Sequence, residues 1–141
     1  MRPAQPPAAE SALARLFTGS HAAKGVVWFS LPGGRPLYRA GQPADTLYFV
    51  RAGRLGVVRE TPGESPHLIG IIKPGEPAGE MALIAGTPHS ATVTALRDSE
   101  ILALSRQAFF AEARKHPDVM AELARLMILR TRQTPSRAGS N

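Results

Sequence analysis

The chain contains no cysteine, few aromatic residues and no long apolar run. None of its 141 residues is Cys, and only 6% are Phe, Trp or Tyr. The lack of cysteine excludes disulfide frameworks, thiolate metal sites and cysteine nucleophiles. No stretch reaches the roughly 18 apolar residues of a membrane-spanning helix, and the first ten residues lack the apolar core of a signal peptide. We therefore expect a soluble, cytoplasmic chain without a transmembrane segment.

The charge balance is basic, but the basic residues are dispersed. Seventeen Lys and Arg residues against eleven Asp and Glu give a formal net charge of +6. Such a balance can accompany nucleic-acid binding, yet the arginines are spread from Arg2 to Arg137 without a dense run. Net charge of this kind acts on solubility and steering rather than on fold. We expect a solvated basic surface and no nucleic-acid binding by this chain alone.

Short apolar runs with β character follow one another at spacings near ten residues. Thirteen glycines and thirteen prolines supply the turns between them, and such spacing is typical of a sandwich or barrel. No run alternates with a long helix before residue 105, which argues against a parallel α/β sheet. The predicted strands are 26–31, 37–39, 47–51, 55–60, 68–72, 90–96 and 101–105.

The N-terminal part reads as a leader followed by a short helix. Residues 1–9 are rich in Pro and Ala, which predicts a disordered leader. In the segment 10–20, Leu13, Leu16 and Phe17 recur at helical spacing. This pattern predicts a short amphipathic helix that packs on the body of the domain.

Two further helices are predicted near the C-terminus. Ser105 is a good N-cap for a helix over 106–115, which His-Pro then interrupts. The helix predicted over 117–132 carries a stripe that needs a partner surface, either within the chain or in a homodimer. The tail over 133–141 is polar and predicted to be disordered. The stripe consists of Val119, Leu123, Leu126, Met127 and Arg130.

The central stretch 73–95, KPGEPAGEMALIAGTPHSATVTA, has the layout of an anion cradle. A Gly-Glu step at 79–80 precedes a one-turn helix candidate at 81–85, and a Gly-Thr-Pro-His turn leads into a strand from Ser90. Backbone N–H groups at the start of a helix are unpaired, and the helix dipole adds partial positive charge there. A phosphate is the natural ligand of such a cradle.

In this order of elements the chain resembles the cyclic nucleotide-binding domain of the catabolite activator protein, the protein kinase A regulatory subunit and cyclic nucleotide-gated channels. The similarity covers about 10–132, which we take as the domain, and the sequence GEMALIAGTPHSATVTA at 79–95 looks like the family's phosphate-binding cassette. The resemblance implies an α+β, mainly β fold. That fold is an eight-stranded antiparallel β-roll or jelly-roll barrel with a short N-terminal helix, an inserted cassette helix and two C-terminal helices.

The cassette offers groups for the phosphate and the ribose of a cyclic nucleotide. Backbone N–H groups of Met81 and Ala82 open the short helix toward a phosphate, and Gly79 permits a backbone conformation that other residues disfavour. The resemblance assigns the family's ribose-binding glutamate to Glu80, which can accept a hydrogen bond from the 2′-hydroxyl. The structural alternative is a carboxylate that only stabilises a helix N-terminus.

His89 departs from the family pattern, which has an arginine at this position. Arginine binds phosphate with two parallel hydrogen bonds, whereas histidine is mostly neutral at pH 7. The change costs on the order of 1.5 to 3 kcal/mol, or roughly tenfold to a hundredfold in affinity. The Ser90 hydroxyl and the N–H groups of Ser90 and Ala91 offer compensation, and a bound phosphate would raise the pKa of His89. The alternative is a surface histidine in a turn.

Other residue patterns point to packing rather than chemistry. Three histidines, His21, His67 and His116, lie far apart without metal-ligand spacing, so we expect no metal site. No hydrolase, metalloprotease or P-loop motif is present, so we expect no catalytic residues. The aromatic residues that we assign to the core or to inter-element packing are Trp28, Phe29, Tyr48, Phe49, Phe109 and Phe110.

Three functions remain open at this point. The first is a regulatory sensor that binds cyclic AMP or cyclic GMP and controls an attached effector. The second is a degenerate domain that binds no ligand and positions a patatin-like phospholipase. It follows from His89 and from the cassette sequence, which looks most like that of domains in bacterial patatin-like phospholipases related to neuropathy target esterase. The third is a transcription factor of the catabolite activator type, which needs a helix-turn-helix after the long helix; only a short polar tail follows residue 132.

Overall fold

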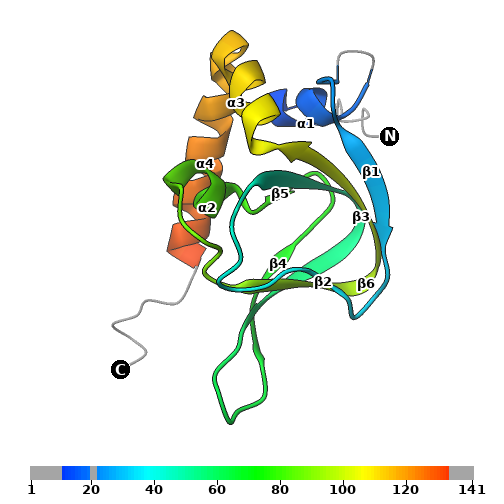
Figure 1. Ribbon diagram of the computed structural model, residues 1–141, viewed down its shortest axis with the longest axis vertical. Helices are drawn as coiled ribbons and strands as arrows, with labels where there is room; N and C mark the ends of the chain where they lie inside the picture. The colour runs from blue at the N-terminus through cyan, green and yellow to red at the C-terminus, as the bar shows by residue number, and fades with distance from the viewer. Residues whose placement is uncertain (1–10, 20–21, 134–141) are drawn as a thin grey trace, which may run out of the picture.

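The computed structural model describes residues 11–19 and 22–133, and shows an antiparallel sheet curled into a roll with helices gathered at one end (Figure 1). The predicted leader over 1–9 lies outside the described residues, as does the predicted tail apart from Gln133, which ends the last helix rather than beginning a disordered tail. Among the described residues, no helix is long and apolar enough to cross a membrane.

The described chain forms four helices and six strands. The helices lie close to their predicted positions, and the one predicted over 106–115 has those same bounds. In chain order the elements are α1 (Ala12–Phe17), β1 (Val27–Leu31), β2 (Pro36–Tyr38), β3 (Thr46–Arg59), β4 (His67–Ile72), β5 (Pro77–Ala78), α2 (Glu80–Ala85), β6 (Thr92–Ser105), α3 (Arg106–Lys115) and α4 (Pro117–Gln133).

The strands form one antiparallel sheet in the order β1-β6-β3-β4, with β2 also paired to β6 and β5 to β3. A mainly β roll is therefore confirmed, but the prediction of eight strands is wrong for the described part of the chain. Two predicted runs at 47–51 and 55–60 are one strand, β3, and two more at 90–96 and 101–105 are one strand, β6. These long strands pair with each other along most of their length.

Residues that read as strand breaks instead form bulges inside the long strands. Gly53 has φ +101°, a left-handed conformation that favours glycine, and the pairing register of β3 with β6 shifts between Val50 and Leu55. Across the bulge, the Arg54 N–H donates to Ser99 Oγ at 3.1 Å, and that hydroxyl donates to the Arg97 carbonyl at 2.8 Å. The side chain of Ser99 thus replaces lost ladder bonds, and the strand continues.

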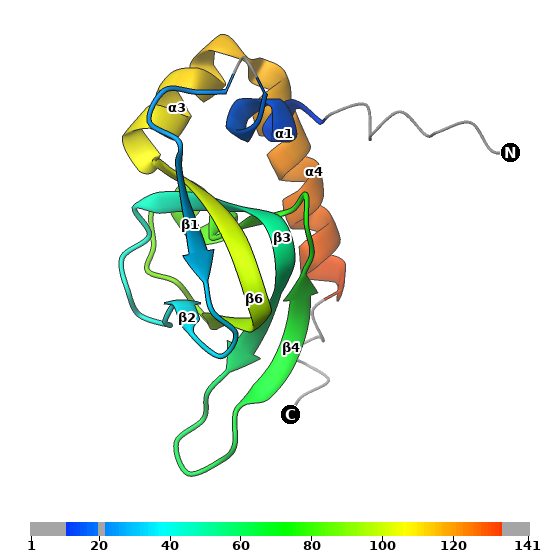
Figure 2. The ribbon, with the colours of Figure 1, turned by 90° about the vertical axis from the view of Figure 1, so that its right-hand side faces the viewer.

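Two apolar clusters fill the molecule. One lies inside the roll, and the other lies where the helices meet its end. Figure 2 shows α1, α3 and the start of α4 at that end, with the β3–β4 hairpin at the opposite end. The helical-end cluster includes Leu13, Leu16, Phe17, Leu83, Phe109, Val119 and Leu123. The roll cluster includes Leu31, Val50, Leu55, Ile72, Val93 and Ile101.

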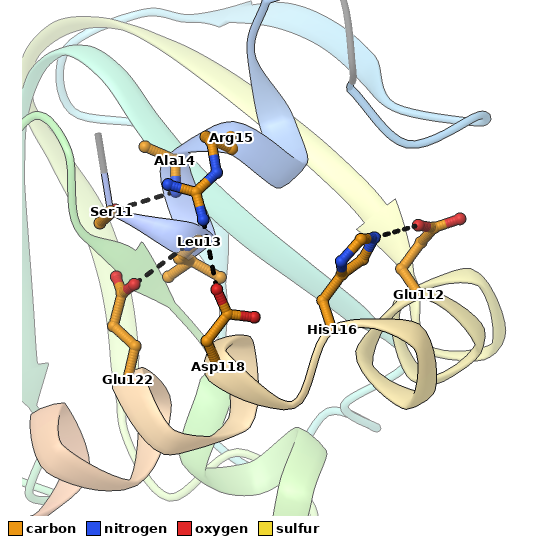
Figure 3. Close-up of polar contacts among 8 residues, drawn as sticks. All are labelled: Ser11, Leu13, Ala14, Arg15, Glu112, His116, Asp118 and Glu122. Carbon is orange, nitrogen blue, oxygen red and sulfur yellow. Dashed lines mark hydrogen bonds and ion pairs between the residues drawn. The ribbon is translucent and has the colours of Figure 1, made fainter. Parts of the chain in front are cut away.

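The short helix α1 is held against α4 by polar contacts as well as by its apolar face (Figure 3). The side chain of Ser11 caps α1, and the Leu13 N–H donates to Glu122 Oε1 at 3.1 Å. Arg15 pairs with Asp118 at 3.2 Å. The stripe predicted on α4 therefore packs within the chain, where Val119 and Leu123 are buried. Ser105 caps α3 as predicted, because its hydroxyl accepts from the Ala108 N–H.

The bulge at Gly53 gives a test of this sheet. In Gly53→Ala the new Cβ would lie 2.5 Å from the Cα of Ser99, whereas in Gly63→Ala nothing lies within 4 Å of it. Both positions have positive φ, so both changes pay about 1 kcal/mol of backbone strain. We expect the free energy of unfolding, measured in urea, to fall by about 1 to 3 kcal/mol more in Gly53→Ala than in Gly63→Ala, because the new Cβ overpacks the bulge. Equal losses for the two variants would contradict the described bulge.

Candidate ligand-binding site

The predicted cassette folds around α2, between β5 and β6. Gly79 precedes the helix with φ +85°, so it has the backbone conformation expected from the sequence. A Cβ at this position would lie 3.2 Å from His89 Cε1 and 3.6 Å from Tyr38 Cε2. The lack of a side chain at Gly79 therefore allows the His89 and Tyr38 rings to lie against the turn that leads into α2.

Glu80 is a buried carboxylate with a cationic partner from the last helix. Its exposed fraction is 2%, and its Oε2 accepts a hydrogen bond from Arg130 Nη1 at 2.6 Å. Arg130 Nη2 also lies 3.8 Å from Glu76 Oε1. No described residue donates a hydrogen bond to Glu80 Oε1, which is buried. Glu80 lies in the first turn of α2, so its carboxylate is also placed to stabilise that helix N-terminus, and its role in binding a ribose stays a prediction.

His89 lies inside the site, and the prediction of a surface histidine is wrong. Its exposed fraction is 6%, and its ring stacks on Tyr38 with a centroid distance of 3.6 Å and an interplanar angle of 12°. Its backbone is also fixed, since its N–H donates to the Gln42 carbonyl at 3.0 Å and its carbonyl accepts from Gly41 at 2.8 Å. Burial lowers the pKa of His89, and the nearby Asp45 carboxylate opposes that change. The ring is therefore neutral at pH 7.

Tyr38 joins the cassette to an aromatic cluster inside the roll. Besides His89, it stacks on Tyr48 at 6.0 Å, and Tyr48 meets Phe29 edge-on at 6.4 Å. Burial and the charge of Glu80 raise the pKa of Tyr38 far above its usual value of 10, although a hydrogen bond from the Gly79 backbone opposes the shift. The phenol therefore stays protonated.

The remaining aromatic assignments are confirmed with one exception. Phe29, Tyr48, Phe49, Phe109 and Phe110 all pack in the two apolar clusters. Trp28, predicted to pack in the core, is 52% exposed. It lies on β1, where successive side chains alternate between the two faces of the sheet, so Trp28 points away from the face on which the partly buried Phe29 packs against the roll cluster.

The other predicted site residues lie next to this centre. Ala82 is buried in α2, the Met81 side chain is 45% exposed, Ser90 is exposed and Ala91 is half-buried just before β6. The structure thus places His89 and Tyr38 against Gly79, and the charge of Glu80 acts on Tyr38. The roles of Met81, Ala82, Ser90 and Ala91 depend on backbone N–H groups or a hydroxyl facing a ligand and stay predictions.

Sequence analysis missed two residues of the site, Tyr38 and Arg130. For Arg130 a signal existed, because this arginine continues the apolar stripe of α4, and a charge on a buried helix face indicates a buried partner. For Tyr38 no local pattern distinguishes a ring inside the site from one in the core. Both residues reach Glu80 or His89 only through tertiary folding.

Comparison with known proteins identifies the family. The family model for the cyclic nucleotide-binding domain matches residues 28–116. The chain belongs to this family. Among the described residues, no three His, Asp or Glu side chains are grouped as a metal site.

Relatives include both enzymes and receptors. The chain is 32% identical over 110 residues to lysophospholipase nte1 of Aspergillus fumigatus, covering 78% of this chain and 7% of that protein. It is 34% identical over 102 residues to the cyclic AMP receptor protein of Thermus thermophilus, covering 72% of this chain and 47% of that one. The crystal structure of the Thermus thermophilus catabolite activator protein matches with a TM-score of 0.71 and 29% identity, covering 94% of this chain and 57% of that one. The chain therefore spans only part of the relatives it matches.

The Glu80–Arg130 pair gives a test of the site geometry. In Arg130→Met the buried Glu80 carboxylate keeps its charge and loses its cation, so we expect a loss of about 3 kcal/mol in the free energy of unfolding. The double variant with Glu80→Gln should recover part of that loss, because the uncompensated charge is gone.

The exposed pair of Arg51 and Glu100, 3.7 Å apart, is the control. Arg51→Met should cost less than about 1 kcal/mol, since the pair is open to solvent. Urea unfolding curves for the wild type and these three variants give the comparison. A similar small loss for Arg130→Met would contradict a buried pair.

Proposed function

We propose that this chain is a regulatory sensor domain that binds cyclic AMP or cyclic GMP and controls an attached effector. The observation that carries the proposal is the buried Glu80 carboxylate, which keeps one oxygen without a hydrogen bond from the described residues and acts electrostatically on Tyr38, the ring stacked on His89. A buried acceptor of this kind is costly unless a ligand donates to it. Membership of the cyclic nucleotide-binding family and similarity to a cyclic AMP receptor protein support this choice of ligand.

In this proposal the ribose 2′-hydroxyl donates to Glu80, and the cyclic phosphate lies between the start of α2 and His89. Met81 and Ala82 supply backbone N–H groups from α2, as Ser90 and Ala91 do from the segment before β6. The His89 and Tyr38 rings are 3.6 Å apart and leave no space between them. A phosphate that reaches the His89 ring nitrogens therefore requires Tyr38 to move or to stack on the ligand's base instead.

The signal in this proposal passes through α4. Arg130 lies on α4 and binds the same carboxylate that the ribose would use, so ligand binding changes the anchor of that helix. A ligand shifts the position of α4 only if it interacts differently with two arrangements of the helix. Displacement or strengthening of the Glu80–Arg130 pair supplies such a difference. Ile128 and Leu129 are exposed on the same helix, which also supports the predicted homodimer through 117–132.

The attached effector in this proposal is a lysophospholipase of the patatin-like type. The support is the similarity to lysophospholipase nte1, of which this chain would form a small part. The catalytic groups would then lie in another domain, and this chain would act as a cytoplasmic regulatory module.

The substitution His89→Arg tests the ligand most directly. An arginine at this position restores a permanent charge and two parallel donors for the phosphate. We expect a tenfold to hundredfold increase in affinity for cyclic AMP or cyclic GMP in isothermal titration calorimetry at pH 7.5. His67→Arg, at an exposed position on β4, adds the same charge outside the site and should leave the affinity unchanged.

If neither the wild type nor His89→Arg binds either nucleotide at millimolar concentration, the sensor proposal is wrong. The degenerate, ligand-free positioning module would then be the better account. The Tyr38–His89 stack would in that case be permanent core packing rather than a binding site that opens for a ligand.

A further inference from the structure

We propose that His89 makes ligand binding proton-coupled, so that the site takes up one proton on the His89 ring for each cyclic nucleotide it binds. This inference rests on the proposed function and adds to it the residue that sets the charge of the site. Its starting point is the position of the ring, which is 6% exposed and in contact with the Gly79 turn, where the phosphate would bind.

The groups around the ring make the proton necessary for anion binding. Tyr38 faces the ring from β2 and stays uncharged, whereas Asp45, just ahead of β3, is the charged group that acts on it most directly. Glu80 from α2 and Arg130 from α4 form an ion pair whose charges cancel. Glu76 lies 3.8 Å from Arg130 and adds another negative charge. With His89 neutral, these groups therefore sum to two negative charges, and a cyclic phosphodiester adds a third.

Protonation of His89 corrects this imbalance without a change of fold. The imidazolium offers donors on both ring nitrogens, whereas the neutral ring offers one. Its charge balances that of the phosphate, whose oxygens accept hydrogen bonds from those donors. In the ligand-free protein the Asp45 carboxylate only partly offsets the cost of burying that charge, so the ring stays neutral. The competent, protonated form is therefore the minor form at pH 7.

The affinity then depends on pH in a defined direction. The apparent dissociation constant equals the intrinsic one divided by the fraction of molecules with a protonated His89. Above the pKa of His89 that fraction falls tenfold per pH unit. Affinity for cyclic AMP or cyclic GMP should thus weaken about tenfold from pH 6.5 to pH 7.5. The charge of the cyclic phosphate itself does not change in this range.

The experiment is titration calorimetry of the wild-type chain with cyclic AMP and with cyclic GMP at pH 6.5 and 7.5, in two buffers of different ionisation enthalpy. We expect uptake of close to one proton per ligand at pH 7.5 and an affinity about tenfold higher at pH 6.5. Histidine-selective NMR of the wild type, which needs no substitution, should show the pKa of His89 rising when ligand binds.

Three variants assign the effect. His89→Arg should bind at both pH values with equal affinity and without proton uptake, and His89→Gln should bind weakly at both. His67→Gln, which removes an exposed histidine, should keep the wild-type pH dependence. Thermal unfolding of each variant confirms that it is folded, and the wild-type proton count tests the proposal even if one is not.

The outcomes separate this inference from the function on which it rests. Binding by the wild type with equal affinity at the two pH values overturns proton coupling and leaves the sensor proposal intact. If His89→Arg binds and the wild type does not bind at either pH, proton coupling is overturned and the degenerate, ligand-free module replaces the sensor. Absence of binding by every variant, His89→Arg included, overturns both.

Discussion

The ion pair between Glu80 and Arg130 is the contact on which the arrangement of the site depends. It joins the cassette helix to the last helix across fifty residues of sequence, with a 2.6 Å hydrogen bond that is almost removed from solvent. Such a pair is weak as a source of stability, because desolvation of the two charges offsets their attraction. Its value lies in specificity. An uncompensated Glu80 is costly enough that α4 has one favoured position over the cassette.

The rest of the fold holds the two ends of this pair in place. The start of α4 is anchored by α1 through Leu13, Glu122, Arg15 and Asp118. The cassette is held by β5 on one side and β6 on the other, and β3 pairs with both. The aromatic cluster packs against the cassette, where Tyr38 stacks on both Tyr48 and His89. In the proposed function, ligand binding at the cassette would change the position of α4 through Arg130, which pairs with Glu80 and lies near Glu76.

Local sequence patterns predicted much of this structure, but they did not predict contacts between residues that are distant in sequence. Ser105 and the stripe on α4 located the last two helices because caps and helical periodicity are local. The cassette located Gly79, Glu80 and His89. The strand count was wrong because Gly53 and Ser99 carry turn chemistry that a long antiparallel pair absorbs as a bulge. The burial of His89 and the partner of Glu80 were not predictable, since both depend on residues from β2 and α4 that meet the cassette only in the folded chain.

We propose that one small site, formed by the Gly79–Glu80 turn and the His89 ring, holds a cyclic nucleotide. The decisive experiment is a crystal structure of the chain grown with cyclic AMP at pH 6. We expect the phosphate within hydrogen-bond distance of a His89 ring nitrogen, the ribose hydroxyl on Glu80, and Tyr38 moved away from its stack. A nucleotide bound elsewhere, with the Tyr38–His89 stack still at 3.6 Å, would contradict it.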